Sequence, residues 1–190
     1  NTVTGFTIEI KKDGTSESKE TVTGLTKTLN FNTTGVYEVI VTVIDNNSHK
    51  NTVSKTYKID ATGPVITFNP ETVTLETEEV NNYNLLTGVS VKDNVDGPIE
   101  VNATNVKTAG SLLKIPNTYK ITYTVKDKLG NESSKERTFV VKDLTKPVIT
   151  ITPNEQSTYV KTKTITINAT DNIKLNSISY VLIKDGVRGT

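Results

Sequence analysis

The chain contains 190 residues, a length that suits one large domain or two ordinary ones. Thr, Val and Ile supply 34, 22 and 16 of these residues, so 72 of the 190 carry a β-branched side chain, whereas Ala occurs only four times. β-Branched side chains favour strands, and a chain with so little Ala has little material for long helices. We therefore expect an all-β protein, and the composition argues against a helical bundle or a doubly wound α/β enzyme.

The charges are balanced and scattered along the chain, with 22 Lys and Arg against 21 Asp and Glu. Because nucleic-acid-binding proteins concentrate basic residues on one face, we expect no nucleic-acid partner. No apolar run approaches the roughly 18 residues of a membrane span, and the opening NTVTGFTIEI lacks the pattern of a signal peptide, so we expect no membrane insertion in this segment. The chain has no Cys, Trp or Met and a single His, which predicts that it is not an enzyme.

The N-terminal region contains the closing strands of a β-module. Val36 to Asp45 reads VYEVIVTVID, in which Tyr37 begins a series of apolar residues at every second position. This period of two is typical of a strand with one buried face. Turn residues at Asp13-Gly14 and a closing strand over Thr52–Ile59 complete the region. We predict that residues 1–60 are a partial module that lacks its N-terminal strands.

An internal repeat places the next module at residues 61–143. PVITFNP at Pro64–Pro70 recurs as PVITITP at Pro147–Pro153, and Tyr37 recurs as Tyr119 at almost the same offset. Two landmarks with nearly one period indicate tandem modules. The middle module holds about seven candidate strands, a number that suits an immunoglobulin-like β-sandwich. The candidate strands are Val65–Phe68, Thr72–Leu75, Val89–Lys92, Ile99–Asn102, Leu112–Ile115, Tyr119–Lys126 and Lys135–Lys142.

Residues 144–190 predict a second partial module, which lacks its C-terminal strands. They contain the opening motif at Pro147 and a candidate strand over Ser177–Lys184, but no counterpart of the Tyr119 strand. A window cut from a longer array explains both partial modules. The alternative is strand exchange, in which the C-terminal half of one molecule completes the N-terminal half of its neighbour.

Four residues are expected to shape the modules. Tyr37 and Tyr119 begin equivalent strands, where the hydroxyl of a tyrosine corner bonds back to an earlier backbone group. Pro64 and Pro147 end two short connections, and Pro fixes its own φ and restricts the residue before it. We therefore expect a semi-rigid array.

The middle module resembles the bacterial immunoglobulin-like modules that occur in tandem in Gram-positive surface and secreted proteins and are appended to some pesticidal crystal proteins. The matching segments are Pro64-Val65-Ile66, Val91–Ile99, Tyr119–Asp127, Leu129-Gly130-Asn131 and Arg137–Val141. One departure is Asn117, where the family usually has Gly. The resemblance implies an extracellular spacer or adhesive module at the cell surface, whose partners are the adjacent immunoglobulin-like modules of the same chain.

Acidic and amide side chains gather in the loops of the middle module and at its ends. Asp and Asn oxygens are the ligands that Ca²⁺ prefers, and the ion needs about six to eight of them. Oxygens that converge where modules meet are therefore candidate calcium ligands, although the same residues are also ordinary turn formers. The candidate set comprises Asp93, Asn94, Asp96, Asp127 and Asn131, with Asp60 or Asp143 at the module connections.

Other polar residues are better explained as solvated loop residues. His49 stands alone in a loop, and a lone His makes no metal site and no catalytic triad. Glu76, Glu78 and Glu79 form a short acidic run, but a glycosidase cleft is usually lined with aromatics and this chain is only 6% aromatic. Lys-to-Asn isopeptide crosslinks occur in some Gram-positive surface sandwiches, and no particular triplet here indicates one.

The sequence favours a non-catalytic structural role. Tandem sandwiches with short, Pro-containing connections suit a stalk that presents a functional domain away from a cell wall. The alternative is an adhesin module that binds a host glycan or protein through loops at the end of a sandwich. Tyr83 and Tyr159 are the candidate loop aromatics for such binding.

Overall fold

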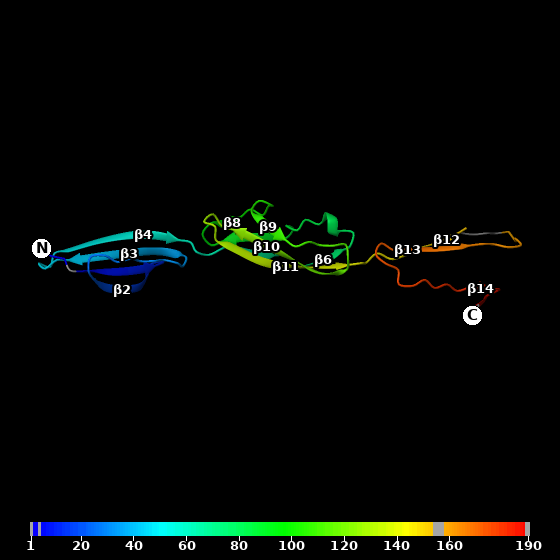
Figure 1. The fold of residues 1–190 in the computed structure, drawn as a ribbon, viewed down its shortest axis with the longest axis horizontal. Coiled ribbons are helices and arrows are strands. Elements are labelled where there is room, and N and C mark those ends of the chain that lie inside the picture. Colours follow the sequence, from blue (N-terminus) through cyan, green and yellow to red (C-terminus); the bar gives the residue numbers. More distant parts are fainter. Residues whose placement is uncertain (1, 4, 154–157, 189–190) are drawn as a thin grey trace. The chain divides into compact units, whose positions relative to one another are not determined.

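The computed structural model describes residues 2–3, 5–153 and 158–188. These residues form fifteen β-strands and one short 3-10 helix, η1 (Val80–Asn82), so the chain is all-β, as its composition predicts (Figure 1). The chain groups into two compact units: residues up to 71, 85–109 and 122–137 form one, and residues 72–84, 110–121 and those from 138 onward form the other. Within the described residues, no helix has the length and apolar character needed to cross a membrane.

The first sheet belongs to the first unit and is four-stranded and antiparallel. It has the order β2-β1-β3-β4 and consists of β1 (Gly5–Lys12), β2 (Thr15–Thr23), β3 (Gly35–Ile44) and β4 (Lys50–Ile59) (Figure 1). Asp13 and Gly14 link β1 to β2 with left-handed φ values of 49° and 83°, which an Asp-Gly hairpin turn requires. Ile8, Val22 and Val39 are buried together, with Phe6 and Leu29 among the side chains packed against them.

Two further sheets follow along the chain. β5 (Val65–Phe68), β7 (Val89–Asp93) and β8 (Gly97–Ile99) form a three-stranded antiparallel sheet in the order β5-β7-β8. β6 (Thr72–Glu76), β9 (Val106–Ala109), β10 (Asn117–Lys126) and β11 (Glu132–Lys142) form a four-stranded sheet in the order β6-β11-β10-β9, and its β6 and β11 are parallel. The division between the two units passes through β10 and β11.

Strand β10 alternates between buried and exposed residues as its sequence predicts. Ile121, Tyr123 and Val125 are buried, whereas Lys120 and Lys126 are exposed. In the first unit, the ring of Tyr123 lies 4.9 Å from the ring of Phe68 on β5, and its hydroxyl donates to the carbonyl oxygen of Leu85 at 2.7 Å. The aromatic pair therefore joins β10 to β5, and the hydroxyl is satisfied although the ring is buried.

Arg137 on β11 is buried with only 1% of its surface exposed. Its Nη1 donates to the carbonyl oxygen of Thr87 at 2.6 Å, and its Nε and Nη2 donate to that of Pro70 at 3.2 and 2.8 Å. The guanidinium also lies over the ring of Phe68, at 5.3 Å from the centroid. One side chain thus ties the turn after β5 to the loop before β7.

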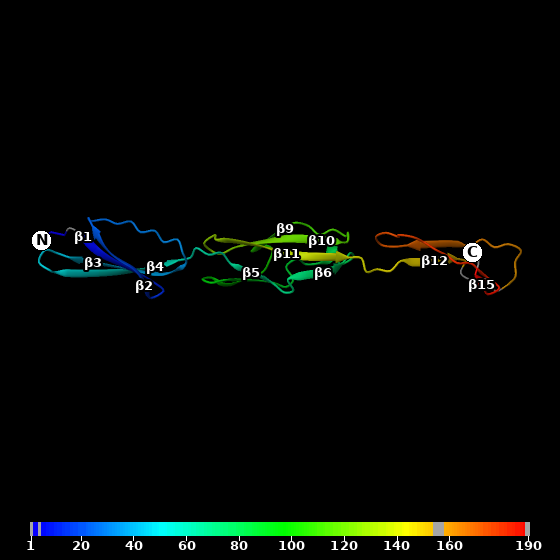
Figure 2. The same cartoon turned by 90° about the horizontal axis from the view of Figure 1, so that it is seen from below.

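The second unit has a buried part and an exposed part. Val73 and Leu75 on β6 and Phe139 and Val141 on β11 are buried, and the ring of Tyr83 meets Phe139 edge-on at 5.8 Å. Further along, β12 (Val148–Thr152) pairs with β13 (Thr166–Thr170), and β14 (Ile183–Lys184) pairs with β15 (Val187–Arg188) (Figure 2). None of the described residues from 144 onward is buried.

Both corner tyrosines make the backward hydrogen bond that the sequence analysis expects. The hydroxyl of Tyr37 donates to the carbonyl oxygen of Thr33 at 3.2 Å, and that of Tyr119 donates to the carbonyl oxygen of Ile115 at 2.8 Å. In each case the acceptor precedes the tyrosine by a few positions, so the bond secures the approach to its strand locally.

Three strand predictions are wrong or misplaced. Leu112–Ile115 is irregular and the strand is instead Val106–Ala109, because Gly110 ends it with a φ of 105° and Pro116 follows Ile115. The strand predicted over Ile99–Asn102 is β8, which ends at Ile99, since the Asn102 side chain caps a turn by accepting from the N–H of Thr104 and Asn105. Only Ile183–Lys184 of the predicted strand Ser177–Lys184 forms a ladder.

Arg137 provides the first test of this architecture. We expect Arg137→Met to lower the free energy of unfolding by about 2–4 kcal/mol, because the carbonyl groups of Pro70 and Thr87 lose their donors. Urea denaturation followed by circular dichroism measures the change. Lys135→Met on the same strand is the control and should cost about 1 kcal/mol or less, because the half-buried Lys135 makes only a surface ion pair with Glu71 and a cation–π contact with the ring of Phe68. Equal effects of the two substitutions would contradict the buried role of Arg137.

Candidate cation site

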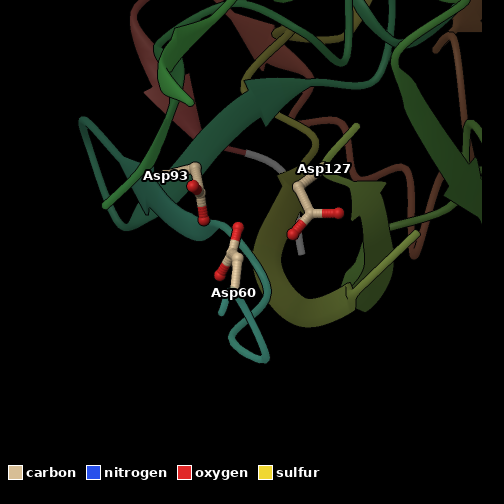
Figure 3. Close-up of side chains that lie close together, drawn as sticks. All are labelled: Asp60, Asp93 and Asp127. Carbon is tan, nitrogen blue, oxygen red and sulfur yellow. The ribbon is translucent and has the colours of Figure 1, made fainter. Parts of the chain in front are cut away.

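Three carboxylates from distant parts of the sequence meet in the first unit. Asp60 follows the last residue of β4, Asp93 is the last residue of β7, and Asp127 follows the last residue of β10. One oxygen from each lies within 4.8 Å of the others. Figure 3 shows the three side chains turned toward one common space. All three stand at strand ends, where Asp is favoured because its side chain accepts hydrogen bonds from the following turn.

The turn after β10 orients Asp127. Its Oδ1 accepts from the N–H of Leu129 at 2.9 Å and of Asn131 at 2.8 Å, and its Oδ2 accepts from Nδ2 of Asn131 at 2.6 Å. The same Nδ2 lies 3.3 Å from the carbonyl oxygen of Asp60. Asn131 therefore holds the Asp127 side chain and the backbone of Asp60 together.

Asp93 is the most deeply buried of the three, with 1% of its surface exposed. Its Oδ1 accepts from the N–H of Val95 at 2.7 Å and of Asp96 at 2.8 Å, so this oxygen closes the turn between β7 and β8. Its Oδ2 is buried and has no hydrogen-bond partner among the described residues. Buried polar atoms are nearly always paired, so this oxygen marks an unusual place in the fold.

Asp60 is held by threonine hydroxyls. Its Oδ1 accepts from the N–H of Thr62 at 3.3 Å, and it lies 3.4 Å from Oγ1 of Thr34 and 3.3 Å from Oγ1 of Thr62. Oγ1 of Thr62 also donates to Oδ1 of Asn94 at 2.9 Å. The hydroxyl oxygens of Thr34 and Thr62 thus lie next to the Asp60 carboxylate, and the amide oxygen of Asn94 lies next to Thr62.

The cluster carries concentrated negative charge. Burial raises the pKa of the Asp127 carboxyl, but the hydrogen bonds from Asn131, Leu129 and Gly130 outweigh it, so the pKa lies below its ordinary value and the group is ionised at neutral pH. In the part of the chain that the structure describes, no Lys, Arg or His forms an ion pair with Asp60, Asp93 or Asp127. The site therefore offers oxygen ligands without a compensating protein cation.

The other predicted calcium ligands lie around or away from this cluster. Asn94 contacts it through Thr62, and Asn131 contributes an amide donor. Asp96 instead accepts hydrogen bonds from the backbone N–H and the ammonium of Lys128, each at 2.9 Å. These two hydrogen bonds lower the pKa of the Asp96 carboxyl. Asp143 lies in the connection after β11, where its Oδ1 accepts from the N–H of Thr145 at 3.2 Å.

The remaining sequence candidates make local contacts. His49 is exposed and its Nδ1 lies 2.9 Å from Oδ2 of Asp45. The carboxylate of Glu76 accepts from the N–H of Leu144, whereas that of Glu78 pairs with Lys114 at 2.9 Å. Tyr159 is fully exposed.

Sequence reasoning did not find the threonines of the site. Thr34 and Thr62 both contact the Asp60 side chain, yet Thr is so abundant in this chain that no single one stands out. The aspartates could be proposed because each ends a strand pattern. The packing of the strands decides which of these aspartates converge, and this packing could not be predicted from the sequence.

A scan against protein-family models finds no match to this chain, and a search of curated proteins finds none either.

The turn after β3 has the same form as the turn after β10. Oδ1 of Asp45 accepts from the N–H of Asn47 and of His49, both at 2.9 Å, in the same relative positions as Leu129 and Asn131. The backbone and side chain of His49 and the N–H of Asn47 lower the pKa of Asp45 below its ordinary value of 3.8. A carboxyl with a lowered pKa stabilises the fold above the pKa of the unfolded chain, and this contribution is lost as the pH falls through the folded value.

We therefore expect Asp45→Asn to remove part of the acid sensitivity of the chain. The Tm of the wild type should exceed that of Asp45→Asn at neutral pH, and the difference should shrink below about pH 4. Thermal unfolding at a series of pH values measures it. His49→Gln should keep most of the wild-type acid dependence, because the backbone N–H of residue 49 remains. Parallel pH profiles for wild type and Asp45→Asn would contradict the assignment.

Proposed function

We propose that the chain is a non-catalytic spacer of a bacterial surface or secreted protein, built of tandem immunoglobulin-like modules that hold a functional domain away from the cell wall. The proposal is carried by one observation: both short connections between successive β-regions are secured by side-chain hydrogen bonds. A spacer needs such restraints, because free hinges let the ends of a chain approach each other.

The first connection, residues 60–64, lies between β4 and β5 in the first unit. The N–H of Ala61 donates to Oγ1 of Thr34 at 2.9 Å, and Oγ1 of Thr62 donates to Oδ1 of Asn94 at 2.9 Å. Pro64 at its end is buried and has a fixed φ. The connection is thus bonded to residues that precede and follow it in the sequence.

The second connection, residues 143–147, lies between β11 and β12 in the second unit. The carboxylate of Glu76 accepts from the N–H of Leu144 at 2.7 Å and from Oγ1 of Thr145 at 2.9 Å. Nδ2 of Asn172 donates to Oγ1 of Thr77 at 3.2 Å. The hydrogen bonds that Glu76 accepts therefore secure the second connection.

Equivalent turns support the tandem arrangement. The turns at Asp45 and Asp127 occupy matching places in the VYEVIVTVID and TYKITYTVKD segments, and they use the same pattern of hydrogen bonds to the second and fourth residues that follow. Repetition of one module is the simplest way to lengthen a stalk. The natural partners of each module are then its neighbours in the same chain, at an extracellular location.

Small-angle X-ray scattering tests the proposal. A compact globule of 190 residues has a radius of gyration of about 16 Å. A spacer of modules about 30 Å long, joined by restrained connections, should instead give about 25–30 Å. The control is a variant with Glu76→Ala and Pro147→Gly, in which the curve should show more flexibility. A wild-type value as small as that of the compact globule would overturn the proposal.

The alternative, an adhesin module, is tested at the exposed aromatic. We expect the immobilised chain and its Tyr159→Ala variant to retain equal, background amounts of host glycans and matrix proteins, because a spacer needs no ligand. Tyr83→Phe tests the second candidate aromatic. It keeps the ring that packs on Phe139, and it should likewise leave capture at the background level. Capture by the wild type that Tyr159→Ala abolishes, with an unchanged circular dichroism spectrum, would favour the adhesin.

A further inference from the structure

We propose that Asp60, Asp93 and Asp127 form a binding site for one Ca²⁺ ion. The three carboxylates converge to within 4.8 Å from the ends of three separate strands (Figure 3). The proposal does not depend on the spacer function, because it is argued from the geometry and chemistry of these side chains alone.

The unpaired oxygen of Asp93 points to a missing partner. Its side chain is almost completely buried, its Oδ1 is used by two backbone N–H groups, and its Oδ2 has no donor in the described part of the chain. A carboxyl oxygen that is buried without a hydrogen bond is destabilising. A bound cation removes this penalty, because it takes the place of the absent donor.

Repulsion within the cluster points the same way. Like charges at this separation destabilise one another unless one becomes protonated or a cation lies between them. Among the described residues, no basic side chain forms an ion pair with any of the three carboxyl groups. A divalent cation bound between the carboxyl groups offsets this repulsion.

The ligand type and spacing select Ca²⁺. Oxygens bound to one Ca²⁺ at about 2.3–2.6 Å are at most about 5 Å apart, and the cluster satisfies this limit. Carboxylates and neutral oxygens suit hard cations, whereas Zn²⁺ prefers the nitrogen and sulfur ligands that this site does not contain. Mg²⁺ keeps several of its waters and is seldom held by a cage of protein ligands, so the carboxylate-rich cluster favours Ca²⁺.

The ion would secure the first connection. Asp60 belongs to that connection, whereas Asp93 is the last residue of β7 and Asp127 directly follows β10. Asn131 already links Asp127 to the backbone of Asp60, so the ion would add a second link at the same place. Oγ1 of Thr62 lies beside Asp60 and donates to Oδ1 of Asn94, and water would complete the coordination of the ion.

Isothermal titration calorimetry of CaCl2 into the full chelator-treated chain tests the site. We expect one ion per chain with a Kd of about 0.1–1 mM, the range of extracellular calcium modules. Asp93→Asn and Asp127→Asn should each weaken binding at least tenfold. Asp143→Asn is the matched control, because it lies in the equivalent position of the second connection, and it should bind like the wild type.

Thermal unfolding separates a metal ligand from a merely structural aspartate. CaCl2 at 10 mM should raise the Tm of the wild type but not that of Asp93→Asn. In chelator, Asp93→Asn should be at least as stable as the wild type, because the substitution removes a repulsive charge. A lower Tm of Asp93→Asn in chelator, with the same rise in CaCl2 as the wild type, would overturn the proposal.

Two further outcomes would also overturn it: the absence of heat and of a Tm change at 10 mM CaCl2, or an equal response to MgCl2. Scattering with and without CaCl2 keeps the two proposals apart. Calcium binding by a chain with the radius of gyration of a compact globule would support the site and reject the spacer. An extended chain without calcium binding would do the reverse.

Discussion

The fold of this chain depends on the hydrogen bonds that aspartates at the strand ends accept from backbone N–H groups. In Asp45, Asp93 and Asp127, one carboxylate oxygen accepts the backbone N–H groups of the turn that follows, so the strand stops and the chain reverses. A carboxylate has two oxygens, and the turn engages only part of their capacity. The other oxygen remains available for a side chain or another partner. In Asp45 that partner is His49, in Asp127 it is Asn131, and in Asp93 the described structure supplies none.

A few polar side chains also hold the rest of the fold. The chain has no disulfides and few aromatic residues, so its order rests on alternating β-branched residues and on a small number of polar links. Arg137 satisfies two carbonyl groups at the turn after β5, and Glu76 holds the connection after β11. From residue 144 onward the described strands are held by backbone pairing rather than by burial.

Much of the local structure can be predicted from the sequence because it depends on neighbours in the chain. The period of two predicts which residues of β10 are buried, and Asp-Gly predicts the turn between β1 and β2. The prediction fails where an apolar run has no partner strand. Leu113 and Ile115 look suited to a strand, but they are exposed, and the edge position beside β10 is taken by Val106–Ala109.

The sequence by itself determined the all-β class, the strand-end turns and the set of aspartates from which a cation site could be drawn. Only the tertiary structure decided that Asp60, Asp93 and Asp127 meet while Asp96 and Asp143 do not, and that Arg137 is buried. The physical reason is distance along the chain. A turn or an alternating strand is set by residues within about five positions, whereas the three carboxylates are brought together by the pairing and packing of strands from separate parts of the sequence.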